Sequence, residues 1–209
     1  LGPEDAIRRN ERLKVGIIYI LSGCFLAMGL YHLLLFFIRP QERATLYFGL
    51  ICLGMAIRCL TLKHFLLDLW PGLGMQGIYR IWLISSYLFM PTGLLYAQAN
   101  FPQETERPVV RFFIIWAVIC SMVVLLTPSN IFVYTVVPYE LVGILSIIYG
   151  GVIIYRAVSR KRDGSIWIFA GVLIFALTVA NDVLYEYRLI QTVTLIPLGT
   201  LALLISQAI

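Results

Sequence analysis

The amino-acid sequence predicts an all-α protein that crosses a membrane seven times. Hydrophobic residues make up 60% of its 209 residues and charged residues only 13%, against about 25% charged in soluble domains. Mean hydropathy is +0.89. The apolar residues also form seven long stretches joined by short polar connectors, so a water-soluble fold is excluded.

Each stretch is long enough to be a spanning helix, because a hydrocarbon core about 30 Å thick needs about 20 helical residues. Barrel strands are excluded because the stretches are too long and too continuously apolar. The predicted helices are 15–38, 44–62, 77–98, 109–126, 131–155, 164–185 and 192–209. We therefore expect a seven-transmembrane helical domain over 15–209, preceded by a juxtamembrane leader over 1–14.

Short connectors and helix-bending residues define the packing. A charged turn around Pro40 ends the first helix, and a turn around Pro128 separates the fourth from the fifth, so neighbouring helices must run antiparallel. Pro91, Pro138 and Pro197 fall inside the third, fifth and seventh predicted helices, where each is expected to remove a backbone hydrogen bond. The glycines are interpreted as packing positions.

The distribution of basic residues predicts which side each connector faces. The first, third and fifth connectors hold eight: Arg39, Arg43, Arg107, Arg111, Arg156, Arg160, Lys161 and Arg162. The other three hold only Lys63 and Arg188. This asymmetry predicts an N-terminus outside and a C-terminus inside, although four basic residues of the leader oppose it. The net charge of +5 follows from this topology and does not indicate nucleic-acid binding.

The two ends of the sequence suggest a part of a larger polypeptide. Leu1-Gly2-Pro3 is typical of the remnant of a cleaved tag, and the last apolar stretch stops at Ile209 without a polar flank. We expect a domain outside before Glu4 and another inside after Ile209.

No cofactor or metal is expected. Cys24, Cys52, Cys59 and Cys120 all fall within apolar helices, where thiols pack as small hydrophobic groups. His64 and Asp68 share a helical face, but two groups are too few for a catalytic metal site. The seventh helix contains no lysine, which excludes a retinal Schiff base.

Charged side chains inside the predicted helices are the candidate functional residues, because burying a charge in lipid is costly and such groups usually face a partner. Arg58, Arg80, Glu140 and Asp182 all fall in the outer half of the predicted bundle. The sixth helix adds Thr178, Asn181 and Tyr185, which share one face with Asp182.

We expect these seven residues to form an inward-facing polar cluster, in which Arg58 and Arg80 pair with Asp182 and Glu140. Two interpretations remain open. The cluster either fixes helix packing as a satisfied ion-pair network, or binds a ligand or couples a signal.

Several short segments resemble the bacterial seven-transmembrane receptors with diverse intracellular signalling modules. They are Gly29-Leu30-Tyr31, Leu35-Phe36-Phe37, Leu46-Tyr47-Phe48, Ala56-Ile57-Arg58 and Ala180-Asn181-Asp182-Val183-Leu184-Tyr185. The resemblance covers about 15–209. It implies a bacterial inner-membrane receptor with a periplasmic sensor domain before the bundle and a cytoplasmic module after it, typically a histidine kinase or a cyclic-nucleotide enzyme.

The sequence thus predicts a signalling domain that is not itself an enzyme and contacts membrane lipids. A small-molecule transporter or channel is the alternative, although it needs a polar path through the inner half, which is almost wholly apolar. An intramembrane enzyme needs converging catalytic groups, and His32 stands alone. The sequence leaves open whether the bundle forms a homodimer.

Overall fold

The computed structural model describes residues 3–61, 72, 74–162, 164–193 and 195–207. Its regular elements in this part of the chain are all helical, which confirms the all-α fold. They are α1 (Pro3–Ile38), α2 (Arg43–Thr61), α4 (Gly74–Asn100), α5 (Arg107–Leu126), α6 (Ser129–Phe132), the 3-10 helix η2 (Val133–Thr135), α7 (Val136–Ser159), α8 (Ser165–Glu186) and α9 (Ile196–Gln207).

Five segments of the described chain are long and apolar enough to cross a membrane. They are Gly16–Ile38, Arg43–Thr61, Arg107–Leu126, Ser129–Ser159 and Ser165–Tyr185. Helices α4 and α9 take the places of the third and seventh predicted spans. Helix α4 has 27 residues and α9 has 12, and neither is among these five segments. The protein is therefore a multi-pass membrane protein.

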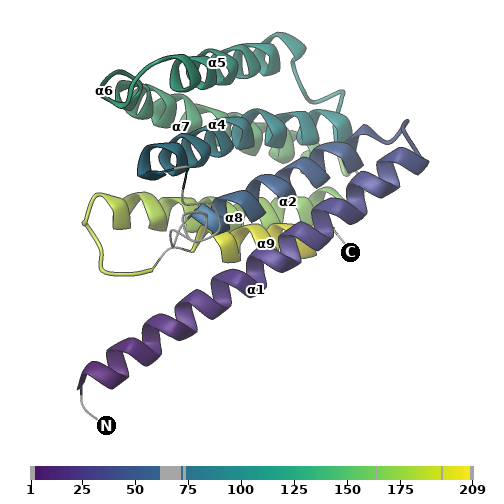
Figure 1. Ribbon diagram of the computed structural model, residues 1–209. Helices are drawn as coiled ribbons and strands as arrows, with labels where there is room; N and C mark the ends of the chain where they lie inside the picture. The colour runs from purple at the N-terminus through teal and green to yellow at the C-terminus, as the bar shows by residue number, and fades with distance from the viewer. Residues whose placement is uncertain (1–2, 62–71, 73, 163, 194, 208–209) are drawn as a thin grey trace.

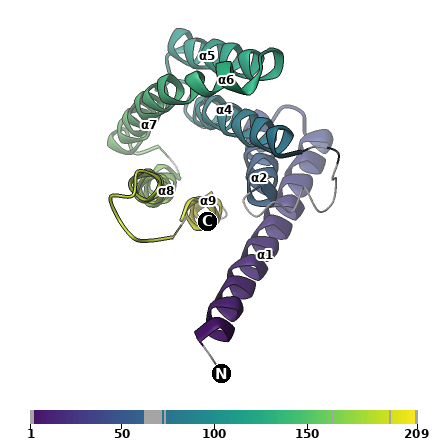
Figure 2. The ribbon, with the colours of Figure 1, turned by 60° about the vertical axis from the view of Figure 1, so that its left-hand side comes forward.

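Helix α4 lies at the centre of the bundle. It packs against α2, α5 and α7, while α1 packs on α2 and α8 pairs with α9 (Figures 1 and 2). Three groups of buried side chains fill these contacts. One joins α1 to α2 around Phe25 and Met55, a second joins α4, α5 and α7 around Tyr87, and a third joins the same helices around Ile153.

The outer surface is apolar, as lipid contact requires. The exposed fraction reaches 78% for Phe37 on α1 and 75% for Leu126 on α5. The exposed faces of α7 and α8 also carry large aliphatic and aromatic side chains, such as Leu145 and Ile166. This is the arrangement expected where lipid tails, rather than water, cover the protein.

The described part of the predicted leader is helical. Helix α1 has 36 residues and begins at Pro3, so the described part of the leader continues the first span as one rod. Figure 1 shows α1 beginning at one end of the bundle and α9 finishing toward the other. Which end faces outside stays a prediction.

Two of the three prolines occupy positions that differ from the prediction. The fifth predicted helix is divided, so that Pro138 lies in the first turn of α7, and Pro197 lies in the first turn of α9. Backbone N–H groups of a first turn have no partner within the helix, so a proline there costs no hydrogen bond. Pro91 lies inside α4, as predicted.

Gly29 and Gly49 bring α1 and α2 into close contact, so the packing interpretation holds for these two glycines, whereas others, such as Gly54 and Gly143, have nothing within 4 Å of an added Cβ atom. A Cβ atom added to Gly29 would lie 2.8 Å from the Leu53 side chain and 3.2 Å from the Gly49 carbonyl oxygen. Gly23, two turns earlier on α1, has nothing within 4 Å. Gly29 therefore sets the separation of the two helices, and Gly23 does not.

We predict that Gly29→Ala destabilises the bundle by about 1–3 kcal/mol, because the added methyl group overpacks the contact. Gly23→Ala is the matched control and should be neutral or slightly stabilising, since alanine favours a helix more than glycine does. Reversible unfolding of the purified protein in mixed micelles measures both. Equal effects of the two substitutions would contradict the assigned contact.

Candidate functional site

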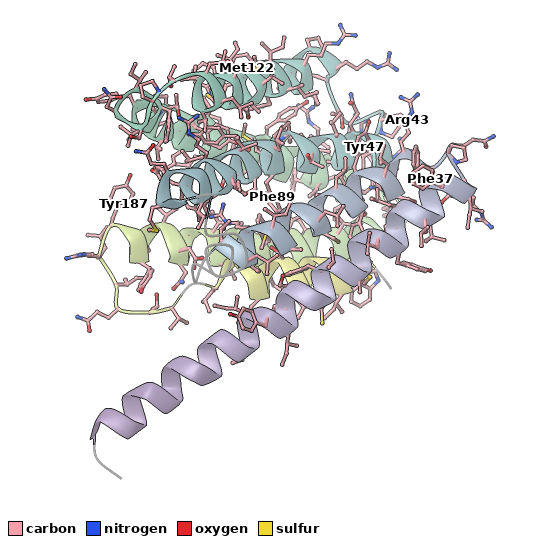
Figure 3. All side chains as sticks on the ribbon, viewed as in Figure 1. Phe37, Arg43, Tyr47, Phe89, Met122 and Tyr187 are labelled. Carbon is pink, nitrogen blue, oxygen red and sulfur yellow. The ribbon has the colours of Figure 1, made fainter. Side chains whose placement is uncertain are left out.

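The four predicted charged residues lie at the same end of the bundle. Arg58 is in the last turn of α2, and Asp182 is near the end of α8, whereas Arg80 and Glu140 are near the beginnings of α4 and α7. Because neighbouring helices run in opposite directions, these helix ends coincide (Figure 1). We call this the polar end of the bundle. Figure 3 labels Tyr187 there, and Arg43 at the opposite end.

Asp182 holds the beginning of the last helix. Its side chain is buried, and Oδ1 accepts hydrogen bonds from the backbone N–H of Leu195 at 2.6 Å and from the Asn181 amide at 2.9 Å. The Leu195 carbonyl in turn accepts from the N–H of Gly199, so Leu195 occupies the capping position of α9. A carboxylate at a helix N-terminus satisfies an otherwise free donor and is attracted by the positive end of the helix dipole.

Asn181 and Thr178 complete the contact between α8 and α9. The Asn181 amide also donates to the Val193 carbonyl at 2.9 Å, in the connector between the two helices. One turn earlier on α8, Thr178 packs so closely on Gly199 that any Cβ atom at residue 199 would overlap it. The predicted helical face of Thr178, Asn181 and Asp182 therefore points toward α9 and its connector.

Tyr185, the fourth residue of the predicted face, is more exposed than the other three. It is 44% exposed and, together with Arg188, Gln191 and Thr192, lines an open hollow of about 530 Å³ on the connector surface. Two residues further on, the Tyr187 hydroxyl donates to the Glu140 carboxylate at 3.2 Å. Glu140 thus ties the beginning of α7 to the end of α8.

Arg80 has other partners than those predicted. Its guanidinium donates to the carbonyl oxygens of Val124, Leu125 and Thr127 at 2.9–3.0 Å and lies over the Phe132 ring. These are the last carbonyls of α5, which the helix itself leaves without donors. The expected pairing of Arg80 with a carboxylate is therefore wrong, because a helix C-terminus supplies the negative charge instead.

Arg58 faces α4. Its guanidinium donates to the Ser86 hydroxyl and lies 5.2 Å from the centre of the Trp82 ring. The Ser86 hydroxyl also donates to the Trp82 carbonyl at 2.8 Å. Ser86, which was not among the predicted site residues, therefore joins the last turn of α2 to α4.

A tyrosine pair that was not among the predicted site residues supports α4 at Pro91. Pro91 has no N–H to donate to the carbonyl four residues earlier, which belongs to Tyr87. The Tyr139 hydroxyl of α7 donates to that carbonyl at 2.9 Å, and the two tyrosine rings lie 4.0 Å apart. Tyr87 in turn shares a hydrogen bond with Thr135. Pro91 was the sequence signal for this contact, since the Tyr87 carbonyl that it leaves without a partner requires a donor from elsewhere.

A second polar group lies at the opposite end of the bundle, between the α4–α5 and α7–α8 connectors. The Glu104 side chain is only 1% exposed and pairs with Arg160 at 2.9 Å and with Arg162 at 3.5 Å. Arg156 lies 3.8 Å from Glu106. These arginines are topology signals in the sequence, and their ion-pair partners were not predicted.

The described residues contain no group of three His, Cys, Asp or Glu side chains that could hold a metal ion. Cys52, Cys59 and Cys120 are buried thiols, as predicted, whereas Cys24 is exposed. His32 packs edge-on against Phe48, with ring centres 4.4 Å apart. The predicted pair of His64 and Asp68 lies outside the described residues.

Comparison with known proteins identifies one relationship. The family model described as "7TM diverse intracellular signalling" matches residues 15–209. No curated protein and no solved structure gives a significant match.

We predict that Tyr139→Phe lowers the free energy of unfolding by about 1–2 kcal/mol, because the Tyr87 carbonyl then loses the donor that replaces the proline N–H. Tyr134→Phe is the matched control, since Tyr134 is 78% exposed. Unfolding in mixed micelles gives both values. A loss for Tyr134→Phe as large as that for Tyr139→Phe would argue against the assigned role.

Proposed function

The chain belongs to the 7TM diverse intracellular signalling family, and we propose that it is the membrane domain of a bacterial sensory receptor in the inner membrane. In this proposal the polar end faces the periplasm and receives a signal from a sensor domain of the same polypeptide. The other end passes it to a cytoplasmic module, a histidine kinase or a cyclic-nucleotide enzyme. The family is associated with signalling, and the bundle itself carries no catalytic step in the proposed mechanism.

The contact between Asp182 and Leu195 carries the proposal. It attaches α9, the last helix, to α8 at the polar end, whereas α9 finishes toward the opposite end (Figure 1). A helix is stiff along its axis, so a displacement of its first turn is transmitted to its last turn. A change at the polar end can therefore reach a module attached beyond α9.

A series of contacts connects α1 with α9. Helix α1 packs on α2 at Gly29, and α2 contacts α4 through Arg58. Helix α4 is joined to α7 by Tyr139, α7 to α8 by Glu140, and α8 to α9 by Asp182. Since α1 is a single helix from Pro3, a movement of its beginning would act on the first contact of this series.

The signal would act by changing the populations of two packing states. Pro91 is the natural hinge, because the Tyr139 hydroxyl of another helix supplies a hydrogen bond to the carbonyl that the proline leaves without its usual donor. Rotation of α7 at the polar end would break that hydrogen bond and, through Glu140, shift α8 with it. This mechanism uses the polar cluster for coupling as well as for packing.

We predict that Asp182→Ala uncouples α9, because no acceptor then remains at that position for the Leu195 N–H. Amide exchange over residues 195–199 should accelerate at least tenfold, and the ratio of stimulated to basal output in the full-length receptor should fall at least fivefold, typical of a coupling of about 1 kcal/mol or more.

Asp182→Asn is the matched variant, since an amide oxygen still accepts the hydrogen bond. It should keep slow exchange and most of the output ratio. Unaltered exchange and output in Asp182→Ala, at normal expression, would refute the coupling role. Equal damage by both variants would show that the charge, rather than the hydrogen bond, is the essential feature.

A further inference from the structure

Two arginines at the beginning of α5 remain outside the ion pairs of the opposite end. Arg107 and Arg111 lie one turn apart on α5, and both are exposed. The ion pairs at this end of the described structure join Glu104 and Glu106 to arginines of α7 and its connector, and none includes Arg107 or Arg111. Two guanidinium groups at this spacing are close enough to bind one anion together.

The same face of α5 continues as an exposed apolar stripe. Ile115, Ile119 and Met122 follow Arg111 at intervals of three or four residues, and their exposed fractions are 59%, 52% and 47%. Figure 3 shows Met122 on the outer side of α5, away from the other helices. This face therefore presents two positive charges at its end and hydrocarbon along its length.

Helix α7 contacts the beginning of α5 and is itself exposed over several apolar residues. Its exposed residues Ile148, Val152 and Tyr155 lead to Arg156, which is 46% exposed in its side chain. The two helices are held together here, because the Tyr149 hydroxyl accepts from the Glu106 N–H at 2.8 Å and the Tyr149 ring stacks on Phe113. Arg156 therefore lies near the beginning of α5, where it pairs with Glu106 and leaves Arg107 and Arg111 as the two arginines outside the ion pairs.

We propose that this face binds an anionic phospholipid. The phosphate would lie between Arg107 and Arg111, and the acyl chains would follow the exposed stripes of α5 and α7. Arginine suits this role because its planar guanidinium donates two parallel hydrogen bonds to phosphate oxygens. A zwitterionic lipid lacks the net negative charge that two unpaired arginines favour.

The apolar stripe distinguishes a lipid from other acidic partners. An acidic protein segment or a free anion would use the arginines alone, whereas a bound phospholipid also places its own acyl chains against Ile115 and Ile119. Acyl chains cover those residues at no cost, because the stripe already faces hydrocarbon. The order of charge and apolar surface along α5 matches the order of headgroup and tail in a phospholipid.

Native mass spectrometry of the purified chain, titrated with phosphatidylglycerol or phosphatidylcholine in detergent, tests this proposal. Wild-type protein should bind phosphatidylglycerol at least tenfold more tightly. Arg107→Gln/Arg111→Gln should weaken that binding roughly 10- to 30-fold, the loss expected for two basic contacts. Arg107→Lys/Arg111→Lys should retain most of it, which separates lost charge from lost folding.

The matched control is Arg39→Gln/Arg43→Gln, which removes two charges from the α1–α2 turn at the same end and should change binding less than twofold. Phosphatidylglycerol binding that survives in Arg107→Gln/Arg111→Gln would overturn the proposal, and so would an equal loss in the control. Displacement of the lipid by inorganic phosphate or by glycerophosphoglycerol at the same concentration would assign the site to a free anion instead.

Discussion

The hydrogen bond from the Leu195 N–H to the Asp182 carboxylate fixes where the last helix begins. In a bilayer every backbone donor and acceptor must find a partner within the protein, because lipid tails offer none. The first N–H groups of a helix have no partner within that helix. At the beginning of α9, the buried Asp182 carboxylate of α8 accepts from one of them. The position of α9 therefore depends on α8, and the rest of the proposed signalling path depends on this link.

The same requirement explains two further polar side chains, Arg80 and Tyr139. Arg80 donates to the last carbonyls of α5, and the Tyr139 hydroxyl donates to the carbonyl that Pro91 leaves free. Each of these side chains serves the backbone of a different helix, so each one also joins two helices. At Asp182, Arg80 and Tyr139, the interaction that satisfies the backbone is therefore also the interaction that couples two helices. This is why the two interpretations of the polar cluster, packing and coupling, do not exclude each other.

The sequence was sufficient to predict the helices and the end at which the charges meet. Long apolar stretches define spans, and antiparallel packing brings Arg58, Arg80, Glu140 and Asp182 to one end without any knowledge of contacts. The partners of Arg80 were not predictable in the same way, because backbone carbonyls have no sequence signature and a free helix end replaced the expected carboxylate. The placement of Pro138 followed from a short 3-10 segment that hydropathy alone does not reveal.

The most direct test of the account measures whether the Asp182 link controls the far end of α9. Spin labels at Ile205 on α9 and Ser159 on α7 would report the distance between these helices at the end opposite Asp182, in protein whose native cysteines are replaced. We expect Asp182→Ala to shift the main distance by about 2 Å or more, or to broaden its distribution by that amount. A distance distribution identical to that of the parent protein would contradict it.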